Sequence, residues 1–377
     1  MRVSCLQENL VRGLSIVGRA VATRTTLPIT QNVLISTDQS RLKLAATNTE
    51  IAITTWIGAQ IEEEGSITLP ARLLTELVNS LPPERVDMTS TSEPTSLSVS
   101  CARFNATING IDADEFPPIP TVDSGLVGKI EPKLLSDAIG HVAFAAATDD
   151  SRPVLTGIKV EISGDDFKFA AADGFRLAVY NGKLSEPMSE DLSLIVPARA
   201  LQEVNRLIGN EEQPIEFTVT PSKSAALFRL DNIEVVTQLL QGTFPNYAQL
   251  IPQSYDTRAL VNLGELLRAT RSASIFARDG SGIIRLIVSE GAEGAPGKMS
   301  IASKAEELGE NYGEVDAWVE GGEARIAFNS KYLSDVLEVL QESEVAVETT
   351  TPSSPGVVRP VGKENYVHVV MPMFVQW

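Results

Sequence analysis

One helical segment occurs three times in this chain, at nearly equal intervals. The copies span residues 69–81, 196–208 and 328–340. Their apolar residues recur at helical spacing, which predicts a helix with one buried face in each copy. A basic residue recurs in register at Arg72, Arg199 and Lys331, so the intervals are 127 and 132 residues in a chain of 377. The sequence therefore predicts three repeated domains.

The three copies agree in detail as well as in spacing. Pro70 and Pro197 are predicted to open their helices, where a missing N–H is tolerated. An acidic residue follows each basic one by four positions, at Glu76, Glu203 and Asp335. The positions predicted to be buried are Leu73, Leu74, Leu77 and Leu81 in the first copy, Ala200, Leu201, Val204 and Ile208 in the second, and Tyr332, Leu333, Val336 and Leu340 in the third.

The segments around these helices also repeat. Apolar periodicity predicts an earlier helix in each third of the chain, at residues 6–23, 131–147 and 263–276. Short strand patterns fill the rest, and linkers are expected near residues 120–128 and 252–257. The predicted fold class is α+β, with two helices packed on antiparallel sheets and about eight short strands in each domain. The predicted domains are 1–121, 128–253 and 257–377.

The cysteines and the hydropathy of the chain indicate which cellular compartment the protein occupies. Cys5 and Cys101 are the only cysteines, and neither belongs to a CxxC pair. This pattern favours a reducing compartment and argues against structural zinc. The apolar run at residues 14–21 is broken by Gly18 and Arg19, and no apolar stretch reaches about 18 residues. We expect a cytoplasmic protein with no signal peptide and no membrane partner.

The net charge of −18 argues against nucleic-acid binding only if charge is spread evenly. Solvent ions screen charges beyond about 8 Å at physiological salt, so the positions of the basic residues matter more than the total. Aromatic residues are not interleaved with them, which favours phosphate contacts over base stacking. Solvated helix ion pairs are the other interpretation, and both stay open. The residues predicted to face DNA are Arg24, Arg72, Arg152, Arg199 and Lys331.

Enzyme chemistry has one candidate. Asp149, Asp150 and Asp173 are carboxylates suited to Mg²⁺, so a metal-dependent nuclease or nucleotidyl transferase is the alternative function. The competing interpretation is that all three belong to turns, as does the glycine-rich segment that begins at Asp279. There are two histidines, neither near a cysteine, and no phosphate-binding loop motif. We expect no cofactor and no metal. A protein-interaction scaffold that binds no nucleic acid is a third reading.

The C-terminal segment is unusually apolar. Residues 369–374 read VVMPMF. They form either a last core strand or, because methionine adapts to varied partners, a peptide-binding pocket with Leu155 and Leu177.

The three repeats also suggest how the protein could assemble, since an arc of three domains can close with a second copy into a ring of six domains. Pairing of the end strands across the two copies would then remove exposed sheet edges.

Five short stretches, taken in order on the triple repeat, resemble one known family. They are RTTLPI at 24–29, RPVLTG at 152–157, AADGFRLA at 171–178, GTFPNY at 242–247 and MPM at 371–373. On these residues the chain resembles the bacterial DNA polymerase III beta subunits, the sliding clamps, over its whole length. The chain departs from the family pattern in its terminal residues 374–377, and at Phe175 and Gln249, where other members carry His and Arg.

The resemblance implies a fold and a function. It implies three clamp domains that form half of a head-to-tail homodimeric ring, with helices inside and sheets outside. It implies a processivity factor without catalysis, which encircles duplex DNA, slides without sequence specificity and tethers the replicative polymerase. Short linear motifs of the polymerase alpha subunit, the clamp loader, other polymerases and repair proteins would bind one pocket.

The resemblance also assigns residues. Arg24 matches a position that touches DNA, and Phe104, with Ile275 and Phe276 opposite, matches the subunit interface. The partner-peptide pocket matches Leu155, Ala172, Gly174, Phe175, Arg176, Leu177, Pro245, Gln249, Leu250, Val369, Met371, Pro372 and Met373.

Overall fold

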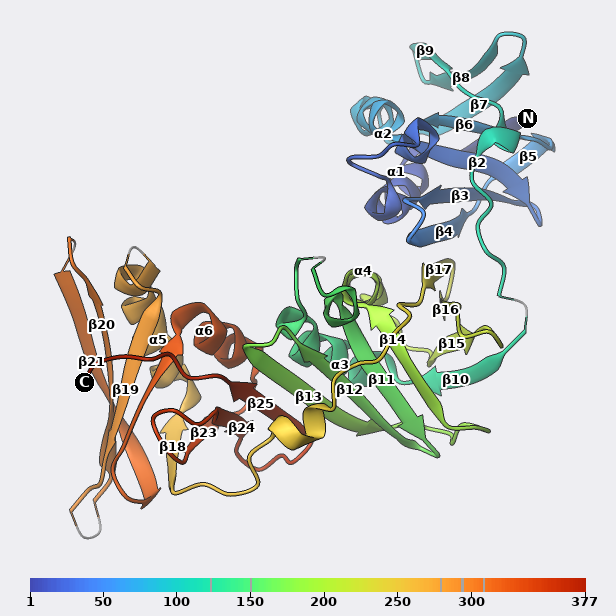
Figure 1. Cartoon of the computed structure of the whole chain (residues 1–377). Coiled ribbons are helices and arrows are strands. Elements are labelled where there is room, and N and C mark those ends of the chain that lie inside the picture. The colour runs from blue at the N-terminus through green and yellow to red at the C-terminus, as the bar shows by residue number, and fades with distance from the viewer. Residues whose placement is uncertain (123, 150, 279, 293–294, 308) are drawn as a thin grey trace. The chain divides into compact units, whose positions relative to one another are not determined.

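The computed structural model describes residues 1–122, 124–149, 151–278, 280–292, 295–307 and 309–377. Figure 1 shows helices and antiparallel strands along the whole chain. Two compact units emerge from the packing. Unit 1 comprises Met1–Pro132, Leu184–Glu190 and Ala200–Leu239, and unit 2 comprises Lys133–Lys183, Asp191–Arg199 and Leu240–Trp377.

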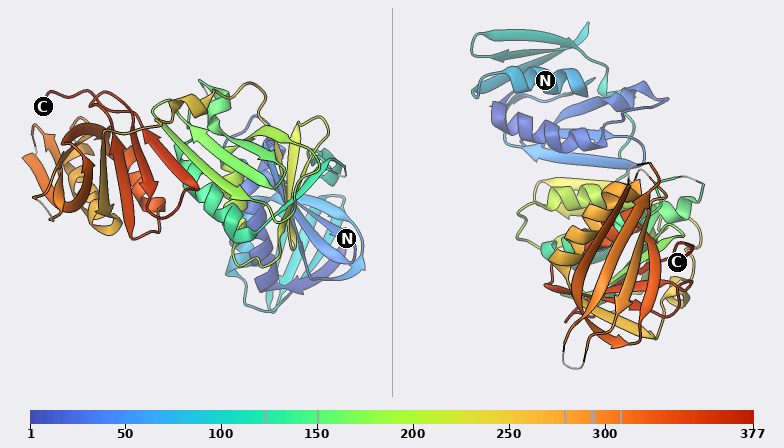
Figure 2. Two further views of the ribbon diagram at one scale, coloured as in Figure 1. Left: turned by 90° about the horizontal axis from the view of Figure 1, so that it is seen from below. Right: turned by 90° about the vertical axis from the view of Figure 1, so that its left-hand side faces the viewer.

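The described residues form six α-helices in three pairs, as the repeat predicts. The first helix of a pair packs beside the second where both lie in one unit, as α1 does with α2 and α5 with α6 (Figure 2). The helices are α1 (Gln7–Val17), α2 (Ala71–Ser80), α3 (Pro132–Val142), α4 (Ala198–Ile208), α5 (Leu263–Arg278) and α6 (Ser330–Val339).

Unit 1 contains two antiparallel sheets. The five-stranded sheet has the order β5-β1-β7-β8-β9, and the eight-stranded sheet has the order β10-β15-β16-β17-β4-β3-β2-β6. The strands of the first are β1 (Arg2–Leu6), β5 (Gln60–Glu63), β7 (Arg85–Ser92), β8 (Thr95–Cys101) and β9 (Phe104–Asn109). Those of the second are β2 (Asn32–Asp38), β3 (Arg41–Thr47), β4 (Ile51–Ile57), β6 (Ser66–Pro70), β10 (Leu126–Ile130), β15 (Ile215–Val219), β16 (Ala225–Leu230) and β17 (Ile233–Gln238).

Unit 2 contains one antiparallel sheet of twelve strands, in the order β14-β11-β12-β13-β25-β24-β23-β18-β21-β20-β19-β22. Its strands are β11 (Gly157–Ser163), β12 (Asp166–Ala172), β13 (Arg176–Lys183), β14 (Leu192–Pro197), β18 (Thr257–Asn262), β19 (Ile283–Ser289), β20 (Gly297–Ala305), β21 (Gly309–Gly321), β22 (Ala324–Asn329), β23 (Glu344–Thr349), β24 (Gly356–Pro360) and β25 (Tyr366–Val370).

The order of elements repeats three times, which confirms the predicted α+β architecture. Each repeat reads strand, helix, a group of strands, helix and three strands, with nine strands in the first repeat and eight in each of the others. The second repeat is divided between the units, because β10 and β15–β17 extend the sheet of unit 1 while β11–β14 belong to unit 2.

Two strand pairings join consecutive repeats. The last strand of the second repeat, β17, pairs antiparallel with β4 of the first, and the last strand of the third, β25, pairs antiparallel with β13 of the second. The same relation therefore occurs twice, with hydrogen bonds that run continuously from one repeat to the next.

The strand that opens each repeat is absent from the sequence prediction. β1, β10 and β18 have five or six residues, too few for a clear period of two. The predicted linker near residues 120–128 overlaps the start of β10, because Gly128 is a residue typical of linkers. In the structure a Cβ at Gly128 would lie 2.3 Å from the Phe217 ring, so glycine is the residue that lets the aromatic side chain pack there.

The helices differ from the prediction at their ends. The expected helix 6–23 ends as α1 at Val17 and continues as a 3-10 turn to Ala20. α2 begins at Ala71, one residue later than predicted, and Pro70 is its N-cap. Leu73 is 52% exposed rather than buried, because the buried stripe of α2 runs through Ala71, Leu74 and Val78, about 100° away around the helix.

Candidate functional site

The pairing of β13 with β25 brings the predicted pocket residues of unit 2 together. Leu177 lies opposite Val369 and Arg176 opposite Val370. Beyond β25 the Met371 N–H donates to the Phe175 carbonyl oxygen over 2.8 Å. The last residues of the chain therefore lie against the turn that precedes β13.

A buried cluster lies beneath this pairing. Four predicted pocket residues, Leu155, Ala172, Leu177 and Val369, pack in it with Phe244, Tyr247 and other apolar side chains. They form the base of the site, because they are closed to solvent. The remaining predicted residues Gly174, Phe175, Pro245, Gln249, Leu250 and Met371 are exposed, and Pro372 and Met373 are half-buried. We call the exposed apolar residues Phe175, Leu250 and Met371 the joint surface.

Gly174 is required by the turn that presents Phe175. Its φ of +93° lies in the left-handed region that favours glycine. The Arg152 guanidinium fills the space where a side chain would stand, since Nη1 is 2.7 Å from a Cβ built at Gly174. Arg152 also donates from Nη2 to the Asp173 carbonyl oxygen over 2.8 Å. The residue predicted to face DNA therefore also buttresses the turn beside the joint surface.

Arg176 is the centre of a polar network that the sequence did not reveal. Its side chain is 7% exposed, and its Nε donates to Asp173 Oδ2 over 3.0 Å. Nη1 donates to Asp335 Oδ2 and Nη2 to the Phe144 carbonyl oxygen, each over 2.6 Å. The guanidinium carbon lies 4.5 Å from the Tyr332 ring centroid, a cation–π distance. Each of the three guanidinium nitrogens donates a hydrogen bond within the protein, so Arg176 positions the turn.

The network lines a cavity of about 540 Å³ between the turn and α6. Phe175 stacks on Tyr332 across it, with ring centroids 6.5 Å apart and planes 23° apart. Asp335 also accepts from Lys331 Nζ over 2.7 Å. Two predicted groups, the pocket residues Phe175 and Arg176 and the basic residue Lys331, therefore meet at one place.

Behind Arg176 lie the fully buried side chains of His368 and Tyr366, with the half-buried Phe144 beside them. His368 stacks on Phe144 at 5.4 Å, and its Nδ1 lies 3.3 Å from the Tyr366 hydroxyl. Burial, and then the Arg176 charge, lower the pKa of His368 to about 3, so its imidazole is neutral at physiological pH. Burial likewise raises the pKa of Tyr366. The pairing of the strands thus rests on a neutral aromatic layer, for which the sequence offered only the rarity of histidine as a signal.

The carboxylates of the alternative enzyme are occupied in turns. Asp173 Oδ1 accepts the backbone N–H groups of Phe175 and Arg176, and its other oxygen binds the Arg176 side chain. Asp149 accepts from Ser151, and these hydrogen bonds lower its pKa. Asp150 and Asp279 lie outside the described residues. No group of three or more His, Cys, Asp or Glu within the described ranges is placed to hold a metal.

The helices are electrostatically unlike the rest of the chain. They carry nine basic and seven acidic side chains, which leaves 22 basic and 42 acidic residues elsewhere. The negative charge therefore resides in strands and loops, and the helices carry a slight positive excess.

The predicted ion pairs within the repeated helices form in two copies of three. Arg72 Nε lies 2.8 Å from Glu76, with both side chains largely exposed, and Lys331 pairs with Asp335 as described above. In the second copy Glu203 binds Arg206 and Arg19 instead, and no carboxylate partner of Arg199 occurs among the described residues. Arg24 and Arg199 are exposed.

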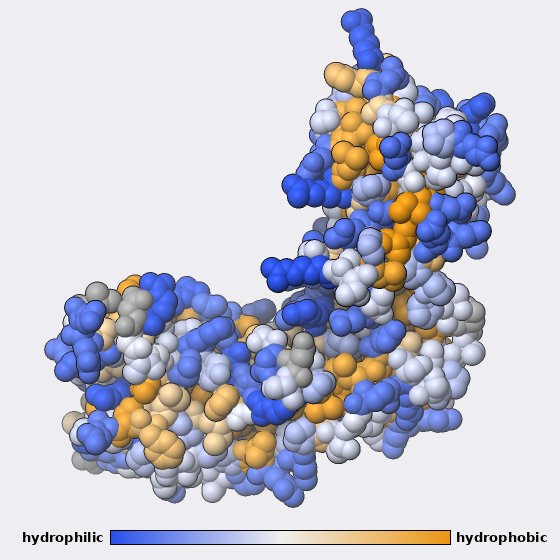
Figure 3. Space-filling view, turned by 45° about the horizontal axis from the view of Figure 1, so that its top comes forward, coloured by the Kyte–Doolittle hydropathy of each residue, from blue (hydrophilic) through white to orange (hydrophobic). Residues whose placement is uncertain are grey.

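The residues matched to a subunit interface are exposed apolar side chains. Phe104 on β9 is 58% exposed and Ile275 on α5 is 61% exposed, with Phe276 half-buried beside it. On the face drawn in Figure 3 the surface is mainly hydrophilic and hydrophobic residues gather in patches. Exposed apolar residues on an edge strand, such as Phe104, or on a helix face, such as Ile275, are candidates for contact with another chain.

Three family models for the DNA polymerase III beta subunit match successive parts of the chain. The N-terminal domain model matches residues 1–120, the central domain model 129–246 and the C-terminal domain model 248–374. None of the helices in the described parts is both long and apolar enough to cross a membrane.

Relatives align over the full length. The beta sliding clamps of Synechocystis sp. and Synechococcus elongatus are 30% and 31% identical to the chain, and each alignment covers 99% of both proteins. The crystal structure of the DNA polymerase sliding clamp from Bacillus subtilis superposes with a TM-score of 0.93 at 28% identity, and all of each chain is covered. The predicted resemblance is confirmed, and the chain belongs to the DNA polymerase III beta subunit family.

Proposed function

We propose that the protein is the sliding clamp and processivity factor of a replicative DNA polymerase, and that it acts in the cytoplasm as a homodimeric ring around duplex DNA. As a beta subunit it is non-catalytic, and the metal-dependent alternative is not favoured. We assign its clamp domains to residues 1–121, 128–253 and 257–377.

One observation supports ring closure above all. β4 and β13 each receive the last strand of the next repeat, and the corresponding strand of the third repeat is β21. β18 pairs only with residues 317–321 of β21, so within the described chain residues 309–316 have β20 on one side and no strand on the other. The last strand of the first repeat, β9, pairs only with β8. The free edge of β9 and the free edge of β21 could therefore pair with each other.

Pairing β9 of one chain with β21 of a second chain would form the same strand pairing between repeats a third time, after β17 with β4 and β25 with β13. Two copies related by a two-fold axis form two such joints, which close six domains into a ring without free edges at the joints. Phe104 on β9 would meet the region of Ile275 and Phe276, because α5 packs against β21.

The helices are proposed to face the DNA. Arg24, Arg72, Arg152, Arg199 and Lys331 would contact phosphates, without sequence specificity because phosphates are the same at every step. The acidic strands and loops would lie on the other side, away from the phosphates. Nonspecific, water-accessible contacts of this kind allow sliding.

Topological retention on DNA is the test of this function. Loaded on a nicked circular plasmid by its clamp loader, the protein should remain bound, because a closed ring leaves DNA only at an end. After the plasmid is cut once, it should leave within the time of gel filtration. The measurement is the fraction of labelled protein that co-elutes with DNA. Equal retention on circular and cut DNA contradicts the ring.

The joint surface is proposed to receive the short linear motifs of the polymerase alpha subunit, the clamp loader, other polymerases and repair proteins. Its support is an exposed apolar rim over a rigid buried base, the arrangement that suits a short peptide anchored by apolar side chains. Within the predicted set, Leu155, Ala172, Leu177 and Val369 would form the base, and Arg176 would hold the turn.

Replacing Met371 and Met373 together with alanine should weaken binding of a polymerase motif peptide by about tenfold or more, since each truncation removes on the order of 1 kcal/mol of apolar contact. Calorimetric titration measures the affinity, and light scattering should show an unchanged dimer. Leu6→Ala, an equally apolar exposed truncation at the end of β1, serves as the control. An unchanged peptide affinity in the double variant would remove Met371 and Met373 from the site.

A further inference from the structure

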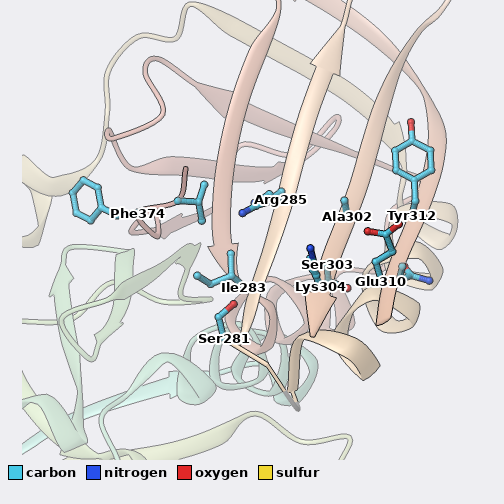
Figure 4. A pocket seen from close by; sticks show the side chains of 11 residues that line it. Ser281, Ile283, Arg285, Ala302, Ser303, Lys304, Glu310, Tyr312 and Phe374 are labelled. Atoms are coloured by element: carbon cyan, nitrogen blue, oxygen red, sulfur yellow. The ribbon is translucent and has the colours of Figure 1, made fainter. Parts of the chain in front are cut away.

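A second cavity in unit 2 has no role in the function proposed above. It has a volume of about 530 Å³ and lies on the exposed face of β19, β20 and β21, beside the C-terminal tail (Figure 4). The tail contributes Phe374 and Val375 to its lining. Phe374 is 89% exposed, so the apolar side of this cavity is open to a partner.

The floor of the cavity presents one guanidinium between short side chains. Arg285 on β19 lies opposite Ala302 of β20 and opposite Ala327 of β22. Ala302 in turn lies opposite Tyr312, whose hydroxyl is 3.0 Å from Ser300 Oγ and donates to Glu314. Tyr312 is thus held as a wall, and the nitrogen atoms of Arg285 point toward the side where Phe374 lies (Figure 4).

Arg285 has no carboxylate partner among the described residues. Lys304, which also lines the cavity, and Arg325 on β22 share this property, although Glu310 faces Lys304 across the strands. Basic residues of the third repeat with acidic partners include Arg258, Arg271, Lys298, Lys331, Arg359 and Lys363. In a chain of net charge −18, an unpaired cation on a cavity floor favours an acidic ligand.

The tail connects this cavity with the joint surface. The Met371 N–H bonds to the Phe175 carbonyl, and two residues later the Met373 N–H donates to the Ala327 carbonyl over 2.7 Å. The tail therefore runs from the joint surface to the cross-strand row that contains Arg285. From Met371 to Val375 is four residues, a span of at most about 14 Å.

We propose that partner segments continue past the joint surface along this tail, and that an acidic side chain about four residues beyond the motif binds Arg285 in the cavity. The proposal rests on the proposed function, because the motif must first be held at the joint surface. It makes the region around Phe374 and Arg285 a determinant of partner choice. Partners whose flanking residues are basic would be disfavoured there.

Synthetic peptides that span the clamp-binding motif of the polymerase alpha subunit test this. One series carries alanine in the flanking residues, and the others carry a single glutamate or lysine at the second, fourth or sixth residue on either side of the motif. Calorimetric titration of the full-length protein should show the glutamate peptide binding about fivefold tighter than the alanine peptide near the fourth position, as a partly exposed ion pair provides. The lysine peptide should bind more weakly than the alanine peptide.

Arg285→Ala should abolish the glutamate advantage while leaving the affinity for the alanine peptide unchanged. Lys298→Ala is the matched control, since Lys298 lies on the same exposed face but is paired with Glu314 and does not line the cavity. Equal binding of the glutamate and alanine peptides to the natural protein overturns this inference and leaves the proposed function intact. If no motif peptide binds at all, both the joint surface and this inference fail.

Discussion

Replacing Arg176 with alanine should lower the free energy of unfolding by about 3 kcal/mol, the low end of the range for breaking a buried ion pair. The physical reason is that Asp173 and Asp335 are left largely buried without their shared counter-ion, and the Phe144 carbonyl loses its donor. The cost stays at the low end because Asp335 keeps Lys331 and Asp173 keeps two backbone N–H groups. Calorimetry at one fixed protein concentration measures the change.

The conservative variant Arg176→Lys separates charge from geometry. A lysine ammonium cannot bind both carboxylates and the carbonyl in the planar arrangement that the guanidinium adopts, so an intermediate loss is expected. Arg72→Ala is the control, because the Arg72–Glu76 pair is exposed and its removal should leave the transition unchanged. A transition in Arg176→Ala that matches the natural protein would mean that the network does not hold the second and third repeats together.

Replacing both Phe104 and Ile275 with arginine should convert the dimer to monomers at micromolar concentration. Both side chains are mostly exposed in the single chain, yet lie at the two ends that the ring would join. Unpaired charges buried at an interface cost several kcal/mol, which raises the dissociation constant on the order of a thousandfold or more. Light scattering should give 40.6 kDa for the variant and about twice that for the natural chain.

The same variant should lose retention on circular DNA, because an open half-ring cannot encircle a duplex. Leu73→Arg is the matched control, since Leu73 is also about half exposed and sits on α2, which is neither of the two elements that carry Phe104 and Ile275. Leu73→Arg should remain a dimer. A double variant that still has twice the chain mass would show that the subunits meet elsewhere.

Glu76, Glu203 and Asp335 recur in register beside the basic residues, and one hypothesis is that all three weaken the contacts of those basic residues with DNA. The structure separates them. Glu76 is exposed and free for that role, whereas Asp335 belongs to the buried network of Arg176. A charge reversal at Asp335 would therefore disturb folding as well as sliding, and Glu76 is the position where the hypothesis can be tested by itself.

The residues predicted to form the pocket divide into a buried set and an exposed set, a difference in depth that the sequence did not indicate. Leu155 and Leu177 do lie beside the C-terminal strand, but as a closed base, while Met371 and Leu250 stay exposed. Short motifs in the sequence indicate which residues lie close together, because residues adjacent along the chain are also adjacent in space. Depth depends on which side of a strand faces the neighbouring layer, and for β25 that is set by pairing with β13, nearly two hundred residues earlier.

By itself the sequence determined the triple repeat, the α+β class and most of the buried positions of the repeated helices, because these follow from periodicity within about a dozen residues. Only the tertiary structure decided how the repeats join, which strand edges stay free and which cation is buried. Hydrogen bonds between strands and ion pairs such as Arg176–Asp335 connect residues far apart in the chain, so no local pattern encodes them. For the same reason the unpaired Arg285 became visible only once β19, β20 and β22 were placed side by side.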